Sequence, residues 1–225
     1  MQDFSSYGFC GMAFKHLIFA LFAACLALFP AQAPARAEPF QIVGFGDSLM
    51  AGYGLDPGDS FPEKLQAALR KNGHDVVIAN AGVSGDTSSG GLSRLDWSVP
   101  DGTHLVILEL GANDMLRGIS PDITEKNLDA MLQRLKARNI PVLLAGMRAA
   151  PNLGSDYAAA FDAIYPRLAE KYDVPLYPFF LDGVAADQTA LLEDGMHPNA
   201  GGIDRMVERI LPVVESAIAA QAKGA

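Results

Sequence analysis

Apolar residues along the chain fall either into short unbroken runs or into stripes with helical spacing. The runs lie at residues 41–46, 75–79, 105–108 and 142–145, and around Leu176. Unbroken apolar runs, unlike alternating ones, are typical of parallel strands that are covered on both faces. We therefore expect five short buried strands in one parallel sheet.

Helical patterns separate these runs. Stripes with an apolar residue at every third or fourth position cover residues 128–135, 161–168 and 206–214. Pro166 is expected to kink or break the second stripe, because proline lacks the donor that a helix interior uses. With no repeat and no linker, this alternation predicts one three-layer α/β domain, whose ligands bind beyond the carboxyl ends of the strands.

Local signals also mark helix ends. Ser60 and Glu63 have the spacing of a capping box, and Ser120-Pro121 has the pattern of a helix start. Gly73, which follows Lys71 and Asn72, is typical of a helix end. These signals predict one helix from about residue 61 to 71 and another from residue 121.

The first 37 residues have a different pattern. Lys15-His16 precedes an apolar run over residues 17–29, and small residues then lead to Ala35-Arg36-Ala37. A charged region, a short apolar region and an A-x-A site are typical of a secretory signal peptide. The run is too short to span a bilayer comfortably, so a retained membrane anchor is the weaker alternative.

We expect residues 1–37 to be a signal peptide that is cleaved after Ala37, with either Met1 or Met12 as its start. Residues 38–225 would then form the mature domain, without a stable membrane anchor. The expected location is periplasmic or secreted.

Both cysteines, Cys10 and Cys25, lie in the expected leader. The mature chain would therefore have no disulfide, no cysteine nucleophile and no cysteine-rich metal site. Cleavage also removes Asp3, Lys15 and Arg36, so that 17 basic and 26 acidic residues become 15 and 25, a net charge of −10. Such a charge disfavours nucleic acid and anionic lipid surfaces as partners.

The first expected strand ends in the polar triplet Gly46-Asp47-Ser48. A G-x-G-x-x-G dinucleotide pattern is broken at Leu49, and the G-x-S-x-G nucleophile elbow is broken at Met50. Neither pattern explains the serine. A phosphate cradle is therefore not supported, and a nucleophile needs other evidence.

That evidence comes from the far end of the chain, where Asp194 precedes His197 by three residues. A neutral imidazole can take the proton of a serine hydroxyl, and a carboxylate can orient that imidazole. The other histidines of the mature chain, His74 and His104, are expected at element boundaries or on the surface. Ser48, His197 and Asp194 are therefore candidate members of a catalytic triad.

Two more polar segments follow the second and third expected strands. The first covers residues 80–87, and the second is Leu110-Gly111-Ala112-Asn113-Asp114. Each alone is typical of a turn. An acyl-transfer enzyme needs donors aimed at a developing oxyanion, and backbone N–H groups or an asparagine amide can supply them. Because all three segments follow parallel strands, they are expected at the same edge of the sheet.

Four blocks in this order resemble the SGNH (GDSL-type) hydrolase superfamily. They are Gly46-Asp47-Ser48, Ser84-Gly85-Asp86-Thr87, Gly111-x-Asn113-Asp114 and Asp194-x-x-His197-Pro198. The longer stretches GDSLMAGYGL, NAGVSGDTSSGGLSRL, ELGANDMLRG and DGMHPN are similar to the secreted bacterial thioesterase I/lysophospholipase and arylesterase group. The resemblance covers nearly all of residues 40–215, with one departure at Gly82, where related sequences often carry serine.

The resemblance implies a flavodoxin-like five-stranded parallel sheet. It implies Ser48 as nucleophile, His197 as general base and then acid, and Asp194 as the residue that orients His197. The oxyanion would be held by the backbone N–H groups of Ser48 and Gly85 and by the side-chain amide of Asn113. No metal or cofactor is required, and Asp86 and Asp114 are expected to hydrogen-bond the loops rather than to bind a cation.

Apolar residues near these blocks predict an adaptable groove for the substrate. They are Leu49, Met115, Leu116, Met147 and Met196. The expected partner is a small-molecule ester or lipid: aryl and short-to-medium acyl esters, with thioesters and lysophospholipids as further candidates. One alternative is a carbohydrate O-acetylesterase, for which the lone Trp97, expected in a loop, supplies little aromatic lining. Another is a non-catalytic ligand-binding protein, which the presence of all four blocks disfavours.

Overall fold

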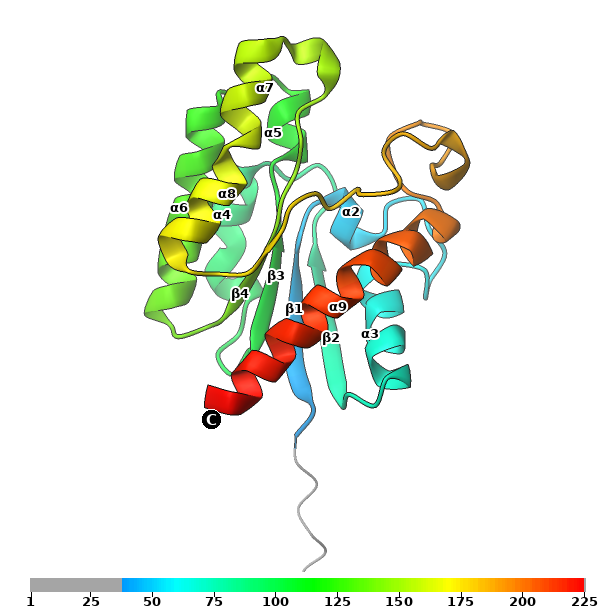
Figure 1. Ribbon diagram of the computed structural model, residues 1–225, viewed down its shortest axis with the longest axis vertical. Helices are drawn as coiled ribbons and strands as arrows, with labels where there is room; N and C mark the ends of the chain where they lie inside the picture. The colour runs from blue at the N-terminus through cyan, green and yellow to red at the C-terminus, as the bar shows by residue number, and fades with distance from the viewer. Residues whose placement is uncertain (1–37, 225) are drawn as a thin grey trace, which may run out of the picture. The chain divides into compact units, whose positions relative to one another are not determined.

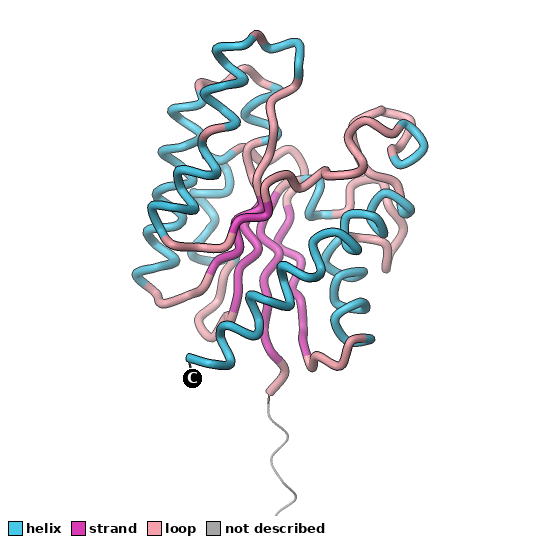
Figure 2. The backbone as a smooth tube through the Cα atoms, in the orientation of Figure 1, coloured by secondary structure: helices cyan, strands magenta, loops and turns pink. Residues whose placement is uncertain are grey.

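The computed structural model describes residues 38–224, so the expected signal peptide and its cleavage site lie outside the described residues. Within them, five parallel strands form one sheet in the order β2-β1-β3-β4-β5 (Figure 2). The strands are β1 Phe40–Gly46, β2 Val76–Gly82, β3 Leu105–Glu109, β4 Val142–Ala145 and β5 Leu176–Tyr177. The predicted five-stranded parallel sheet is confirmed.

Helices cover both faces of this sheet, which confirms the three-layer α/β architecture (Figure 1). They are α2 Ser48–Ala51, α3 Phe61–Lys71, α4 Ser88–Ser98, α5 Ala112–Leu116, α6 Pro121–Ala137, α7 Ser155–Asp162, α8 Ile164–Tyr172 and α9 Ala200–Gly224. Short 3₁₀ turns lie at Pro151–Leu153 and Gln188–Ala190. Helices α3 and α9 pack together on one face, and α4, α6 and α8 lie on the other.

Most helix limits follow the sequence signals. Ser60 and Glu63 form the predicted capping box of α3, and α6 begins at Pro121. The predicted break at Pro166 is wrong, because the chain breaks at Ala163, between α7 and α8. Pro166 lies in the first turn of α8, where the missing N–H costs no intrahelical hydrogen bond.

The apolar runs form the core, but β2 departs from the prediction. Strands β3 and β4 are buried throughout, whereas β2 is an edge strand and is only partly buried. Two side chains of α3 bond its backbone: Gln66 Oε1 accepts from Ile78 N–H (2.8 Å) and Arg70 Nε donates to the Val76 carbonyl (2.9 Å). These contacts occupy edge groups that could otherwise pair with another strand.

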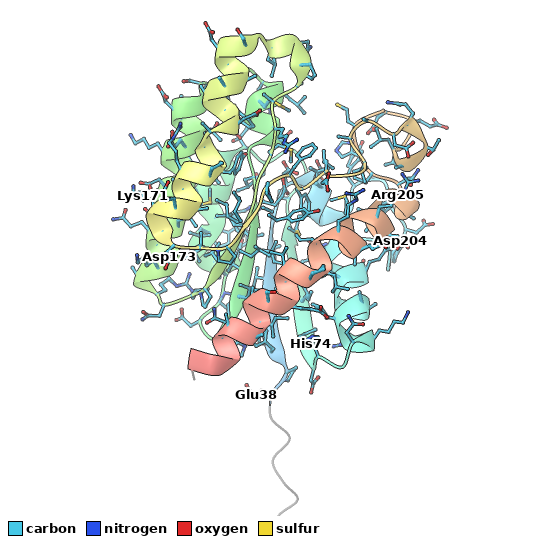
Figure 3. The ribbon with its side chains drawn as sticks, in the orientation of Figure 1. Glu38, His74, Lys171, Asp173, Asp204 and Arg205 are labelled. Atoms are coloured by element: carbon cyan, nitrogen blue, oxygen red, sulfur yellow. The ribbon has the colours of Figure 1, made fainter. Side chains whose placement is uncertain are left out.

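Charged side chains lie on the outer surfaces of the helices. Lys171 on α8 pairs with Asp129, and Arg205 on α9 pairs with Asp187 (Figure 3). Trp97 lies in α4 rather than in the expected loop, and it is 75% exposed. Among residues 38–224, no helix has the length and hydropathy that crossing a membrane requires.

Strands β2, β1 and β3 are neighbours, so the segments that follow them meet at one edge of the sheet. The strand that follows β1 in the sequence, β2, lies on one side of β1, and the next strand, β3, lies on the other side of β1. The carboxyl ends of β1 and β3 therefore form the switch point at which open α/β sheets bind ligands. The three polar segments predicted to form a site lie at this edge.

Candidate active site

Ser48 is the first residue of α2, and only Asp47 separates it from the end of β1. A Cβ on Gly46 would lie 2.5 Å from Glu109 Oε2, so only glycine lets β1 approach β3 this closely. Asp47 then caps α2, because its Oδ1 accepts from the Leu49 N–H (3.0 Å). Ser48 is left 9% exposed, at the wall of a cavity.

The structure brings together Ser48, His197 and Asp194. His197 Nε2 lies 2.9 Å from Ser48 Oγ, and His197 Nδ1 lies 2.6 Å from Asp194 Oδ2. These two hydrogen bonds join a hydroxyl, an imidazole and a carboxylate in series. A proton can therefore move from the hydroxyl to the imidazole while the carboxylate holds the other ring nitrogen.

The turn that carries Asp194 and His197 is held by its own side chains. Asp194 Oδ1 accepts from the backbone N–H groups of Met196 (2.9 Å) and His197 (3.0 Å). These bonds, together with the bond to the His197 ring, lower the pKa of Asp194 from 3.8 to about 2. The carboxylate is therefore ionised at any pH above about 4.

Further contacts fix the turn to its surroundings. Asn199 Nδ2 donates to the carbonyls of Thr189 (2.9 Å) and Leu191 (3.0 Å), and its Oδ1 accepts from Gly202 N–H at the start of α9 (2.9 Å). The Tyr53 ring packs against the His197 ring, with 4.5 Å between centroids. The imidazole is thus held from its backbone, its Nδ1 atom and one ring face.

Asn113, in α5 after β3, lines the same cavity as Ser48 and His197. Its Nδ2 donates to Asp47 Oδ2 (3.0 Å). An asparagine amide has two N–H groups, so one remains after this bond. Asn113 is therefore tied to the residue before Ser48 and keeps a donor for a ligand.

Gly85 lies in the loop after β2 with φ of +83°, in the left-handed region that favours glycine. It is joined to α5 by Arg117, whose Nη2 donates to the Gly85 carbonyl (2.7 Å). Arg117 is the C-cap residue of α5. The segments that carry Gly85 and Asn113 are thus connected by one side chain.

Three charged residues that support this edge were not predicted. Arg94 is buried in α4 and donates to Asp86 Oδ2 (2.6 Å) and to the carbonyls of Ala81 and Gly46 (2.8 Å each). Its guanidinium lies 4.1 Å from the centroid of the Phe45 ring. Arg94 therefore ties the ends of β1 and β2 to the Gly85 loop.

The other two are a pair of buried carboxyl groups under Ser48. Asp47 and Glu109 are fully buried, and Glu109 Oε2 accepts from Asp47 N–H (3.2 Å). Burial raises the pKa of Asp47 from 3.8 to about 6, and burial together with the nearby Asp47 charge raises the pKa of Glu109 well above 4.5. Within the described residues, Glu109 Oε1 has no hydrogen-bond partner. Burial therefore favours the protonated form of Glu109.

Asp86 and Asp114 hydrogen-bond residues of helices α4 and α6 rather than the loops that were expected as their partners. Asp86 pairs with Arg94, while Asp114 accepts from the Ser88 N–H (2.7 Å) and from Thr124 Oγ1 (3.2 Å). His74 pairs with Glu215 (3.4 Å). Nδ1 of His104, which is exposed, accepts from the Gln41 N–H (2.8 Å). Residues 38–224 contain no group of three or more His, Cys, Asp or Glu side chains arranged to hold a metal ion.

A cavity of about 550 Å³ opens beside Ser48 and His197. All five residues predicted to form a substrate groove line it: Leu49, Met115, Leu116, Met147 and Met196. Phe179, Leu181 and Leu191 extend this apolar wall. The cavity can take an apolar chain while an ester carbonyl lies at Ser48.

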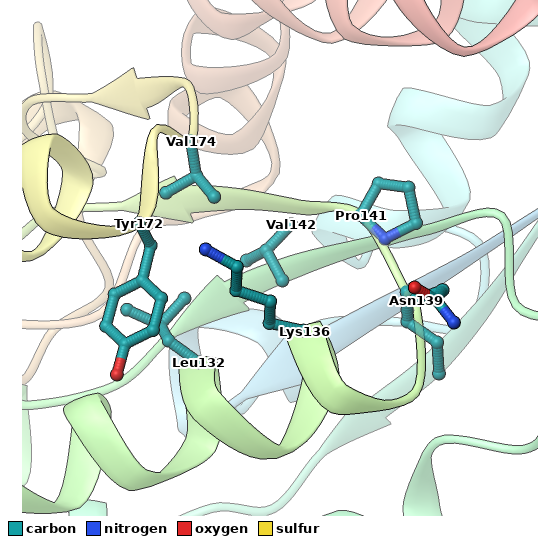
Figure 4. A pocket seen from close by; sticks show the side chains of 8 residues that line it. Leu132, Lys136, Asn139, Pro141, Val142, Tyr172 and Val174 are labelled. Carbon is teal, nitrogen blue, oxygen red and sulfur yellow. The ribbon is translucent and has the colours of Figure 1, made fainter. Parts of the chain in front are cut away.

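A smaller cavity of about 290 Å³ lies at the opposite end of β4 (Figure 4). Its wall includes Pro141 and Val142 at the start of the strand, together with Lys136 and Tyr172. Lys136 Nζ lies 5.7 Å from the centroid of the Tyr172 ring. No serine, histidine or carboxylate lines this cavity in the described part of the chain, so it offers none of the chemistry found beside Ser48.

Comparison with known proteins identifies the family. A sequence model of the GDSL-like lipase/acylhydrolase family matches residues 45–205. Esterase TesA of Pseudomonas aeruginosa is 38% identical over 87% of this chain and 96% of its own length. An arylesterase of Vibrio mimicus is 40% identical over 77% of this chain and 87% of its own length.

Solved structures give the same result. The crystal structure of AlinE4, an SGNH-hydrolase family esterase, is 51% identical and has a TM-score of 0.68, covering 80% of this chain and 97% of its own. The crystal structure of TesA is 38% identical and has a TM-score of 0.75, covering 79% and 99%. The chain belongs to the GDSL-like lipase/acylhydrolase family. It is therefore a carboxylic ester hydrolase.

Proposed function

We propose that the chain hydrolyses esters through a Ser48-His197-Asp194 triad and an acyl-enzyme. The observation that carries this proposal is the continuous pair of hydrogen bonds, 2.9 Å from Ser48 Oγ to His197 Nε2 and 2.6 Å from His197 Nδ1 to Asp194 Oδ2. Such a series activates a hydroxyl that is a poor nucleophile by itself.

In the first step, Ser48 Oγ forms a bond to the ester carbonyl carbon as His197 Nε2 takes its proton. The tetrahedral intermediate collapses, the bond to the leaving oxygen or sulfur breaks, and His197 returns the proton to the leaving group. A water molecule then repeats the sequence on the acyl-enzyme and releases the acid. Asp194, ionised because of its lowered pKa, stabilises the imidazolium in both steps.

The oxyanion is proposed to bind the backbone N–H groups of Ser48 and Gly85 and the free amide N–H of Asn113. The left-handed conformation of Gly85 and the bond from Asn113 to Asp47 support this assignment. Removing one such donor costs about 10²–10³ in kcat.

The substrates are proposed to be aryl and short-to-medium acyl esters, with thioesters and lysophospholipids as further candidates. The apolar wall of the 550 Å³ cavity supports an acyl chain. The same wall argues against the carbohydrate O-acetylesterase alternative, since a sugar needs polar partners. The names of the relatives, an esterase and an arylesterase, agree with this class.

The triad can be tested directly with a fluorophosphonate probe, which labels activated serines. We expect wild type and a Ser155→Ala control to be labelled, and Ser48→Ala to remain unlabelled. A chain-length series of 4-nitrophenyl esters on the same proteins defines the acyl preference. Labelling of Ser48→Ala, or no turnover at any chain length, would contradict the proposal.

We also propose that residues 1–37 direct export and are removed after Ala37, which leaves residues 38–225 as a periplasmic or secreted hydrolase domain. The charged, apolar and small-residue segments of the leader support this. N-terminal sequencing of exported protein should begin at Glu38, and a different first residue would contradict the assignment.

A further inference from the structure

Arg148 differs from the other arginines of the described chain. Nine arginines lie in residues 38–224. Eight of them donate a hydrogen bond or form an ion pair: Arg70, Arg94, Arg117, Arg134, Arg138, Arg167, Arg205 and Arg209. Arg148 is exposed, and it has no hydrogen bond or ion pair with any described residue. Its five N–H donors are therefore available to a ligand.

The position of Arg148 is specific. It lines the same 550 Å³ cavity as Ser48 and His197. Its guanidinium carbon lies 5.2 Å from the centroid of the Phe179 ring, which also lines the cavity. A guanidinium over an aromatic ring is held by cation–π attraction while its N–H groups stay free at the edge.

The backbone beside Arg148 is fixed. Ala149 N–H donates to Asp162 Oδ1 (2.7 Å), and Ala150 N–H donates to Met115 Sδ (3.1 Å). These bonds hold the chain that follows Arg148 against the wall of the cavity. The backbone that carries the Arg148 side chain is therefore held in a defined position beside the cavity.

The charge of Arg148 stands alone in this wall. Among the described residues that line the cavity, no lysine, other arginine, aspartate or glutamate is present. The protein as a whole has a net charge of −9, so its long-range field repels anions. A single guanidinium beside apolar side chains provides the local attraction that an anionic substrate group would need, and its fork matches a carboxylate or phosphate.

We propose that Arg148 is an anion-binding subsite, and that the preferred esters carry a carboxylate or phosphate group away from the ester that is cleaved. This inference rests on the proposed function, because it takes Ser48 as the point of attack. It narrows the substrate class from apolar esters to amphiphilic ones that have a negative charge.

Two pairs of substrates test this and distinguish the source of the charge. For a charge on the acyl group, 4-nitrophenyl monoesters of dicarboxylic acids are compared with 4-nitrophenyl alkanoates of equal chain length. For a charge on the leaving group, a lysophosphatidate is compared with the monoacylglycerol that has the same acyl chain. The readout is the ratio of kcat/KM for the anionic ester to kcat/KM for the neutral one.

We expect Arg148→Gln to lower this ratio by about tenfold in the pair whose charge lies where the preferred substrate carries it, on the acyl group or on the leaving group. A tenfold loss is the effect of one partly solvated, charge-assisted contact. Arg148→Lys should keep part of the ratio. Lys71→Gln removes an exposed positive charge at the end of α3 and controls for long-range charge effects. This variant should have the same ratio as wild type. The difference in this ratio between wild type and Arg148→Gln should become smaller at high salt, because salt screens the charge of Arg148.

The two failures can be told apart. Turnover of neutral esters with the same ratio in wild type and Arg148→Gln, in both pairs, would overturn the anion subsite and leave the proposed function standing. If no ester is turned over, the proposed function fails, and calorimetric binding of a dicarboxylate monoester then tests the subsite by itself. Equal affinity for Ser48→Ala and for Ser48→Ala combined with Arg148→Gln would also overturn it.

Discussion

Asn113 donates one N–H of its side-chain amide to Asp47 Oδ2 (3.0 Å), and Asp47 is the residue directly before Ser48. The same carboxylate accepts from Leu49 N–H (3.0 Å) through its other oxygen. One side chain therefore fixes both the start of α2, which carries the proposed nucleophile, and the proposed oxyanion amide. A change at Asp47 should affect catalysis although Asp47 does not touch the substrate.

Asp47→Asn tests this positioning role. An amide at residue 47 keeps one acceptor and gains a donor, which would face either the Leu49 N–H or the Asn113 amide. We expect kcat to fall by about tenfold to a hundredfold, below the loss of 10²–10³ for Asn113→Ala, with little change in KM. Asp122→Asn, an exposed site on α6, is the control. Wild-type kcat in Asp47→Asn would show that the bond is not needed.

Arg117 should position Gly85. Arg117→Ala removes the bond from Nη2 to the Gly85 carbonyl (2.7 Å) and lets the loop after β2 move away from α5. We expect a fall in kcat of about threefold to tenfold, the size of one hydrogen bond. Arg117→Lys should recover part of it, and Lys126→Ala on α6 should have no effect. An effect on KM alone would instead assign Arg117 to substrate binding.

The Asp47 and Glu109 pair should make stability fall as pH rises. Their pKa values are raised in the folded chain, Asp47 to about 6 and Glu109 well above 4.5. The folded chain therefore holds protons that the unfolded chain releases, so the contribution of this pair is complete below about pH 4. It is lost as pH rises through the folded pKa values.

Glu109→Gln measures how much Glu109 contributes to this pH-dependent loss of stability, because the amide keeps the shape of the side chain but does not ionise. We expect the decline in melting temperature above about pH 4.5 to become shallower in this variant than in wild type. Asp194 has the opposite sign: its stabilisation is lost only as pH falls from about 4 toward 2. Parallel curves of melting temperature against pH for wild type and Glu109→Gln would contradict a raised pKa of Glu109.

A side chain at Gly82 would clash with α2 as this helix lies in the structure. A Cβ at this position would lie 2.2 Å from the backbone N of Ala51 and 2.6 Å from its Cα, both in α2. Gly82→Ala should therefore displace the helix that carries Ser48, lowering stability by about 1–3 kcal/mol and reducing kcat. Gly201→Ala, where the nearest atom is 3.4 Å away, is the control and should leave thermal stability intact.

The fold and the juxtaposition of Ser48, His197 and Asp194 could be predicted because most of their signals are local. Apolar runs marked the strands, Ser60 and Glu63 marked α3, and the D-x-x-H spacing placed Asp194 beside His197. The remaining step followed from topology, since parallel strands bring their carboxyl ends to one edge. The oxyanion roles of Gly85 and Asn113 came from the family resemblance and remain proposals.

The buried charges could not be predicted in the same way. Arg94 lies on the buried face of α4, one residue before the buried Leu95, and sequence spacing alone does not show that it bonds two strand ends. Glu109 ends the apolar run of β3, and it is buried only because β1 and β4 flank that strand. The signal available for Glu109 was an acidic residue that continues an apolar run without a turn.

The bond between Ser48 and His197 joins residues 149 positions apart in the sequence. Between them the chain forms β2 through β5. A polypeptide still being synthesised has the hydroxyl early and the imidazole almost last. The proposed triad can therefore form only after nearly the whole chain has been synthesised.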